Sequence, residues 1–153
     1  MGLTIVVGAD IAGVNYKETL KADLEADARV AEVIDVGVRP GEDIDYPHVA
    51  VEAARKVAAG EADRALLVCG TGMGMAIAAN KVPDIRASVA HDSFSVERLV
   101  LSNDAQILTL GERVIGLQLA RRLVREWLGY TFDPESSSGP KVAAIRSYEP
   151  DPH

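Results

Sequence analysis

The residues whose types and spacing could do chemistry are concentrated in one segment, Cys69-Gly70-Thr71-Gly72-Met73-Gly74. Its alternating glycines carry no Cβ atoms, so the backbone N–H groups between them can approach a ligand closely. A helix is predicted to begin directly afterwards, and its positive dipole end would face the same point. A cysteine beside such groups is favoured as the thiolate. The segment therefore predicts a base or nucleophile next to an oxyanion-binding turn. The alternative is a small buried cysteine that only packs, which is the commoner role of a lone Cys.

The same glycines could also suggest a nucleotide site. The segment lacks the Gly-Lys-Ser/Thr of a Walker motif, and it matches the dinucleotide fingerprint only in part. It also lies in the third strand–helix unit, whereas that fingerprint belongs to the first. A small oxyanion is therefore favoured over a nucleotide.

Three polar residues elsewhere could each have either a functional or a purely structural role. Asp10 ends the first predicted strand, where it could bind a sugar hydroxyl or act as the N-cap of the next helix. Tyr46 could line a pocket or simply pack before a turn. Arg113 follows the last strand, where it could meet a phosphate or lie free on the surface. Residue type alone leaves these alternatives open.

A metal site is not expected. His48, His91 and His153 show no metal-ligand spacing, and no cluster of His, Cys and carboxylate residues accompanies them. We predict neither a metal nor a cofactor.

The elements that must position these residues follow from the alternation of apolar runs with segments of helical period. Strands separated by helices predict an α/β fold, with a parallel sheet, right-handed crossovers and helices on both faces. Ligands of such folds bind beyond the carboxyl ends of the strands, and residues 8–10, 69–74 and 110–113 all fall at such ends. We expect strands over residues 3–8, 30–37, 64–70, 85–91 and 106–111, and a loop over 39–47. Helices are expected over 13–27, 48–59, 71–81, 115–128 and 141–149, and a further helix between the strand 85–91 and about residue 103.

The length of 153 residues suits one domain with a substantial core. We assign residues 1–133 to it. Residues 134–140 are rich in Pro, Ser and Gly and predict a linker, and 134–153 as a whole form a tail. Its helix is too short to be stable alone, so we expect it to dock on the body or on a partner subunit.

Net charge and composition limit the classes of partner that the protein can bind. The net charge is −7, from 16 basic and 23 acidic residues, which argues against nucleic acid. A small anion remains possible, because a few N–H groups and cations can bind a phosphate on an acidic protein. The single cysteine forms no internal disulfide. No signal peptide and no apolar run of roughly 18 residues is found. We expect a cytoplasmic protein without a membrane partner.

Several motifs together resemble those of the ribose-5-phosphate isomerase B and galactose-6-phosphate isomerase family. The resemblance implies a Rossmann-like, three-layer, doubly wound sheet of five parallel strands, with a C-terminal tail helix and no metal or cofactor. It also implies homodimers or tetramers with the site at the subunit interface, and aldose–ketose isomerisation of a small phosphorylated sugar through a cis-enediolate. The motifs are Gly8-Ala9-Asp10, Asp45-Tyr46-Pro47, residues 69–74, Ala78-Ala79-Asn80-Lys81, Asn103-Asp104 and Gly111-Glu112-Arg113-Val114-Ile115-Gly116.

The resemblance also implies a role for each matching residue. Cys69 would shuttle the proton between C1 and C2, and Thr71 would assist proton movement on the oxygens. Arg113 would approach the phosphate with Lys141, the latter from the partner's tail. Met75 stands where some relatives place a glutamate base, and it cannot accept a proton. The implied substrate-binding residues are Asp10, Ile11, Tyr46, Gly70, Gly72, Met73, Gly74, Asn103, Arg113 and Lys141.

The departures from the family pattern bear on the substrate. Ile11 replaces a histidine that contacts phosphate, and Ser102 replaces a histidine that opens the furanose ring. The tail offers Lys141 and serines where the family has two arginines. Serine is a poor general base. Either the protein is a non-catalytic phosphosugar-binding subunit, or its substrate has no ring to open.

An open-chain substrate fits a tetrose 4-phosphate, whose O4 carries the phosphate and cannot close a five-membered ring. Residues 90–98 and 101–106 resemble the erythritol-catabolic branch of the family. That resemblance implies interconversion of D-erythrulose 4-phosphate and D-erythrose 4-phosphate. The ribose 5-phosphate/ribulose 5-phosphate pair is the alternative.

Overall fold

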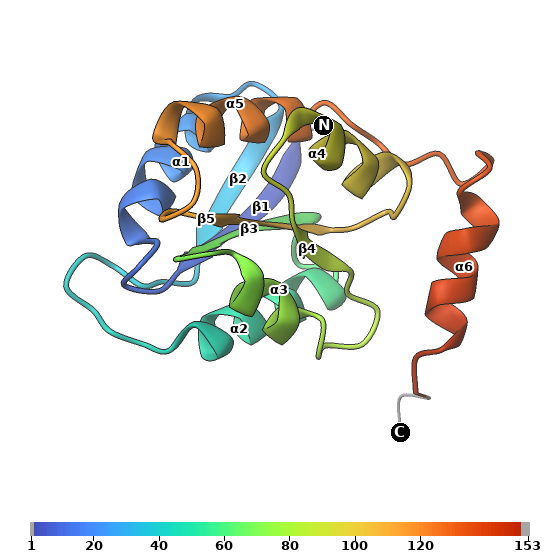
Figure 1. Ribbon diagram of the computed structural model, residues 1–153, viewed down its shortest axis with the longest axis horizontal. Coiled ribbons are helices and arrows are strands. Elements are labelled where there is room, and N and C mark those ends of the chain that lie inside the picture. The colour runs from blue at the N-terminus through green and yellow to red at the C-terminus, as the bar shows by residue number, and fades with distance from the viewer. Residues whose placement is uncertain (1, 151–153) are drawn as a thin grey trace.

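Five parallel strands form the central sheet of the computed structural model, which describes residues 2–150 (Figure 1). Their spatial order is β2-β1-β3-β5-β4. The parallel sheet expected from the apolar runs is confirmed. The strands are β1 (Leu3–Ala9), β2 (Val30–Asp35), β3 (Arg64–Cys69), β4 (Ala87–Val89) and β5 (Ile107–Gly111).

Helices cover both faces of the sheet, so the predicted three layers are confirmed (Figure 1). One face carries α1 (Val14–Ala26), α4 (Ser93–Leu101) and α5 (Leu117–Trp127). The other carries α2 (Tyr46–Ala58) and α3 (Met73–Ala79).

Successive strand side chains point to opposite faces of a sheet. In β3, Leu66 and Val68 therefore join the core under α1, α4 and α5, whereas Leu67 and Cys69 join the core under α2 and α3. This alternation sends the Cys69 thiol toward the α2/α3 layer.

The strand order places two predicted motifs side by side. The chain runs from β1 outward to β2 and then returns to β3 on the other side of β1. Ala9 lies opposite Val68, and Cys69 lies opposite Gly111. The ends of β1, β3 and β5 therefore meet at one edge, at the point where the strand order reverses and doubly wound folds bind ligands.

Helix α2 begins earlier than the sequence suggested. Residues 39–47 were expected to form a loop, with a helix from 48, but Tyr46 is already the first residue of α2 and Asp45 precedes it as N-cap. Pro47 lies in the first turn, where its fixed φ and missing N–H suit a helix start. The loop that was expected over residues 39–47 therefore ends at Asp45, because Tyr46 and Pro47 belong to the helix.

Two strands are shorter than predicted by two residues or more. β4 covers only Ala87–Val89 of the expected 85–91, and β2 ends at Asp35 instead of 37. Gly37 has φ +99°, a backbone conformation outside a regular strand. The chain nonetheless stays beside β1, because the Val38 N–H donates to the Ala9 carbonyl at 2.7 Å.

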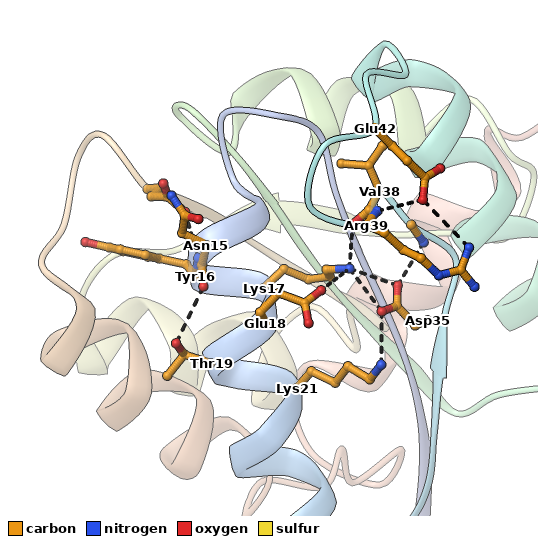
Figure 2. Close-up of polar contacts among 12 residues, drawn as sticks. Asn15, Tyr16, Lys17, Glu18, Thr19, Lys21, Asp35, Val38, Arg39 and Glu42 are labelled. Carbon is orange, nitrogen blue, oxygen red and sulfur yellow. Dashed lines mark hydrogen bonds and ion pairs between the residues drawn. The ribbon is translucent and has the colours of Figure 1, made fainter.

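A buried lysine joins α1 to the end of β2 (Figure 2). The Lys17 ammonium has no exposed surface, and it donates to both Asp35 oxygens at 3.1 and 3.0 Å and to the Val38 carbonyl at 2.7 Å. Glu18 lies 2.8 Å away. A buried ammonium is tolerated only with such partners. Burial raises the pKa of Asp35, but the Gly37 N–H and the ammonium groups of Lys17 and Lys21 outweigh this, so the pKa lies below its usual value.

Asn80, from the Ala-Ala-Asn-Lys motif, connects α3 to β4. Its side-chain amide donates to the Ala87 carbonyl and accepts from the Ala87 N–H, both at 2.8 Å. This part of the motif has a structural role in the fold.

The tail forms α6 (Gly139–Ser147), which Figure 1 shows to one side of the three layers. The linker expected over 134–140 is shorter, because Pro140 lies in the first helical turn. Val142 is buried, and Arg146 pairs with Asp84 at 3.1 Å. Of the tail assigned to 134–153, residues 151–153 lie outside the described residues.

No helix within residues 2–150 is long and apolar enough to cross a membrane.

Candidate active site

Cys69 ends β3 and lies almost fully buried at the carboxyl edge of the sheet. The Gly72 N–H donates a hydrogen bond to its sulfur at 3.1 Å. Gly72 has φ +81° and is the N-cap of α3, a conformation that favours glycine. The chain therefore turns sharply after β3, and the turn places a backbone N–H against the thiol. Such a donor stabilises negative charge on the sulfur.

Two other residues of this turn (residues 69–74, the cysteine turn) face outward. Thr71 is exposed, and its Oγ1 accepts the Met73 N–H at 3.3 Å, leaving the hydroxyl hydrogen free to point away from the turn. Met73 is 55% exposed. The turn thus presents a hydroxyl and backbone groups beside the buried thiol.

Tyr46 lies directly against this turn. A Cβ on Gly74 would overlap the Tyr46 ring, so the ring can lie there only because residue 74 has no side chain. The start of α2 thereby adds a phenol to the same edge.

Asp10 and Ile11 enter from the end of β1. The Asp10 carboxylate accepts the Ala12 N–H at 3.0 Å, whereas the N-cap of α1 is Gly13. Asp10 therefore does not act as the helix N-cap, the structural alternative from the sequence. Ile11 is 59% exposed, so it presents an apolar surface beside the site.

Arg113 completes the cluster from the turn after β5. Its Cδ and Nη1 would lie 3.4 and 3.6 Å from a Cβ on Gly70, so the side chain runs alongside the cysteine turn. The backbones are also joined, because the Arg113 N–H donates to the Gly70 carbonyl at 3.0 Å and the Glu112 N–H to the Cys69 carbonyl at 2.9 Å. A guanidinium in this place suits a phosphate.

Two predicted residues do not join this cluster within one chain. Asn103 is exposed between the end of α4 and the start of β5, which places it at the amino edge of the sheet with Ser102. Lys141 is exposed in the first turn of α6. The other predicted residues gather around Cys69, at the carboxyl edge.

Sequence reasoning missed two residues that hold the site. Thr109 is fully buried in β5, and its hydroxyl donates to the Gly72 carbonyl at 2.7 Å. His91 follows β4, and its Nε2 accepts the Gly111 N–H at 2.9 Å. A polar residue in the apolar run Ile107–Gly111 was the available signal for Thr109. For His91 the signal was its place directly after a strand.

The His91 contact predicts a pH dependence of stability. Because Nε2 accepts an N–H, the imidazole must be neutral, and burial lowers its pKa from 6.5 despite the opposing charge of Asp92. The unfolded chain therefore takes up this proton more readily than the folded one below about pH 6.5. Stability should fall as the pH drops from 6.5 through the lowered native pKa.

His91→Gln keeps an acceptor but does not titrate, so its melting temperature should fall less than that of the wild type between pH 7 and pH 5. Parallel thermal melts across this range provide the measurement. Equal slopes for the two proteins would contradict the assignment.

Within residues 2–150, no three His, Cys, Asp or Glu side chains come together as potential metal ligands.

Known proteins are similar to this chain in sequence and in fold. The profile of a family described as Ribose/Galactose Isomerase matches residues 5–145. D-erythrulose-4-phosphate isomerase 2 of Mycolicibacterium smegmatis is 65% identical, over 97% of this chain and 99% of that protein. D-erythrulose-4-phosphate isomerase of Pectobacterium atrosepticum is 42% identical, over 96% and 95%. The solved structure of Clostridium thermocellum ribose-5-phosphate isomerase B has a TM-score of 0.89 at 41% identity, covering 95% of this chain and 96% of that one.

Proposed function

Because the chain belongs to the ribose/galactose isomerase family, we propose that it interconverts D-erythrulose 4-phosphate and D-erythrose 4-phosphate. It is an aldose–ketose isomerase of sugar phosphates. The observation that carries the chemistry is the Cys69 sulfur held on the Gly72 N–H, in a turn that also carries Thr71.

In the proposed reaction the Cys69 thiolate removes a proton from C1 of the ketose. The electron pair of that C–H bond forms the C1–C2 double bond of a cis-enediolate, and the carbonyl oxygen on C2 becomes an oxyanion. The thiol then returns a proton to C2 while the Thr71 hydroxyl relays one between the two oxygens, leaving an aldehyde at C1. No electrons are gained or lost overall, so the reaction requires no cofactor.

The Gly72 N–H lies on the Cys69 sulfur and the Met73 N–H on Thr71 Oγ1, so the other backbone N–H groups of residues 70–74 would stabilise the developing oxyanion. Preorganised donors of this kind often contribute about 3–4 kcal/mol each to lowering a barrier. Arg113, beside Gly70, would bind the phosphate. Asp10 and Tyr46 border the same turn and would contact the sugar hydroxyls.

The tetrose substrate is favoured by two residues, Ile11 and Ser102, that lack the functional groups of the family's histidines. Ile11 presents an apolar surface where a hydrogen-bond donor would serve a phosphate. Ser102 has no basic group for opening a furanose ring. A tetrose 4-phosphate has no such ring, so the enolising base suffices. The two relatives named above as D-erythrulose-4-phosphate isomerases support the same substrate.

A second copy of the chain would complete the site. Asn103 and Lys141 lie away from their own Cys69, so they would act in the site of a partner. The tail assigned to residues 134–153 contacts its own body through Val142 and Arg146, and it would dock on the partner through its exposed face, which carries Lys141. Met73 in the cysteine turn and Ile77 in the following helix α3 are both exposed and suit such a contact. We propose a homodimer, or a tetramer built from dimers. A cytoplasmic enzyme of erythritol catabolism fits this assignment, since the base must remain a reduced thiol.

Coupled assays with both substrate pairs test the proposal. We expect kcat/KM for erythrulose 4-phosphate to exceed that for ribose 5-phosphate by at least about tenfold. Ser102→His should raise turnover of ribose 5-phosphate and leave the tetrose reaction unchanged. Faster turnover of ribose 5-phosphate by the wild type would favour the pentose alternative. Binding without deuterium incorporation at C1 or C2 in heavy water would indicate a non-catalytic subunit.

A further inference from the structure

Thr109 is a buried hydroxyl at the centre of β5 that the proposed chemistry does not use. It is completely inaccessible to solvent, and a buried hydroxyl needs a hydrogen-bond partner. Its partner is the Gly72 carbonyl, 2.7 Å away and 37 residues earlier in the chain. The one polar side chain of this strand therefore contacts the cysteine turn.

Three further contacts constrain Gly72. Its carbonyl also accepts the Ala76 N–H at 3.2 Å, the first hydrogen bond of α3. Its N–H donates to the Cys69 sulfur at 3.1 Å. A Cβ on Gly72 would lie 3.0 Å from the Leu110 carbonyl carbon and from a Val89 methyl group, so this glycine packs closely on β5 and β4.

We propose that Thr109 is a positioning residue for the Cys69 base, because its hydroxyl fixes the Gly72 backbone and thereby holds the Gly72 N–H on the sulfur. Glycine has wide conformational freedom, so without this contact the turn could rotate while α3 remained intact. The proposal rests on the proposed role of Cys69 as the base. Thr109 itself would touch neither substrate nor reacting atoms.

Thr109→Val tests this directly, since valine has nearly the same shape and replaces the hydroxyl with a methyl group that cannot donate. The Gly72 carbonyl retains the Ala76 N–H, so the melting temperature should fall by only about 2–4 °C. With erythrulose 4-phosphate, kcat should fall about tenfold, with KM nearly unchanged. Thr109→Ser is the matched control, because it restores the hydroxyl and should recover most of the activity.

Alkylation by iodoacetamide at neutral pH supplies a readout independent of turnover. Cys69 is the only cysteine of the 153 residues, so mass spectrometry follows a single reaction. Thr109→Val should react severalfold more slowly than the wild type and Thr109→Ser, because the thiolate loses a fixed donor.

If Thr109→Val kept the alkylation rate and the kcat of the wild type, the proposal would be overturned. Equal losses of kcat and alkylation rate in the Val and Ser variants would also overturn it. Slower alkylation with unchanged kcat would overturn its catalytic part. If Cys69→Ser were then also fully active, the proposed role of Cys69 would have failed, independently of the placement of Thr109.

Discussion

Cys69→Ser is expected to lower kcat by about 10³-fold, within the range that a positioned general base contributes. A serine hydroxyl is far less acidic than a thiol and has no basic partner here, so it cannot take the C1 proton. The protein should remain folded, because the smaller side chain fits the buried position and its oxygen can still accept the Gly72 N–H. KM should change little, since Arg113 and the backbone donors are untouched.

Turnover of erythrulose 4-phosphate, thermal melting and deuterium exchange into the substrate should be measured together. A matched control is Cys69→Ala, which should be equally inactive. Iodoacetamide should inactivate the wild type and leave the residual rate of both variants unchanged. If the Ser variant kept more than about a tenth of the wild-type kcat, Cys69 would not be the base.

Gly13→Ala is expected to destabilise the protein by about 3 kcal/mol, at the upper end of overpacking effects. A Cβ on Gly13 would overlap the Val68 carbonyl and lie 2.9 Å from the Cys69 nitrogen. These are backbone atoms of β3 and cannot rotate away, so α1 must move off the sheet. For a chain of this size, the melting temperature should fall by about 6–12 °C.

Gly116→Ala is the matched control, because a Cβ there meets nothing within 4 Å and its φ of −70° suits alanine. It should cost no more than about 1 kcal/mol, the usual effect of alanine at an N-cap. The Gly13 variant should also lose activity at temperatures where it remains folded, because Asp10 and the cysteine turn are displaced. Equal melting temperatures for the two variants would mean that α1 accommodates the methyl group without moving.

Much of the fold could be predicted from periodicity. The apolar runs at residues 3–8, 64–70 and 106–111 became central strands, because only a sheet covered on both faces buries such runs completely. Element ends were less predictable. Pro47 and Pro140 each lie in the first turn of a helix, although each belongs to a stretch that was expected to be a loop or linker.

The sequence by itself determined the parallel sheet and the cysteine turn. The conformation of residues 69–74 depends mainly on local sequence, because the glycines, the thiol and the following helix are contiguous and interact with one another. That segment alone predicted a base or nucleophile beside an oxyanion-binding turn. Proton transfer between C1 and C2 followed only from the resemblance to the family, and the tetrose from the departures at Ile11 and Ser102 from the family pattern.

Only the tertiary structure decided what surrounds the thiol. The strand order brings the ends of β1 and β5 to Cys69, the turn after β5 brings Arg113 to Gly70, and Thr109 reaches Gly72 from 37 residues away. It also separates Asn103 from the cluster, by placing it at the opposite edge of the sheet. Contacts between distant segments depend on strand order and packing, and no local pattern of residues encodes these.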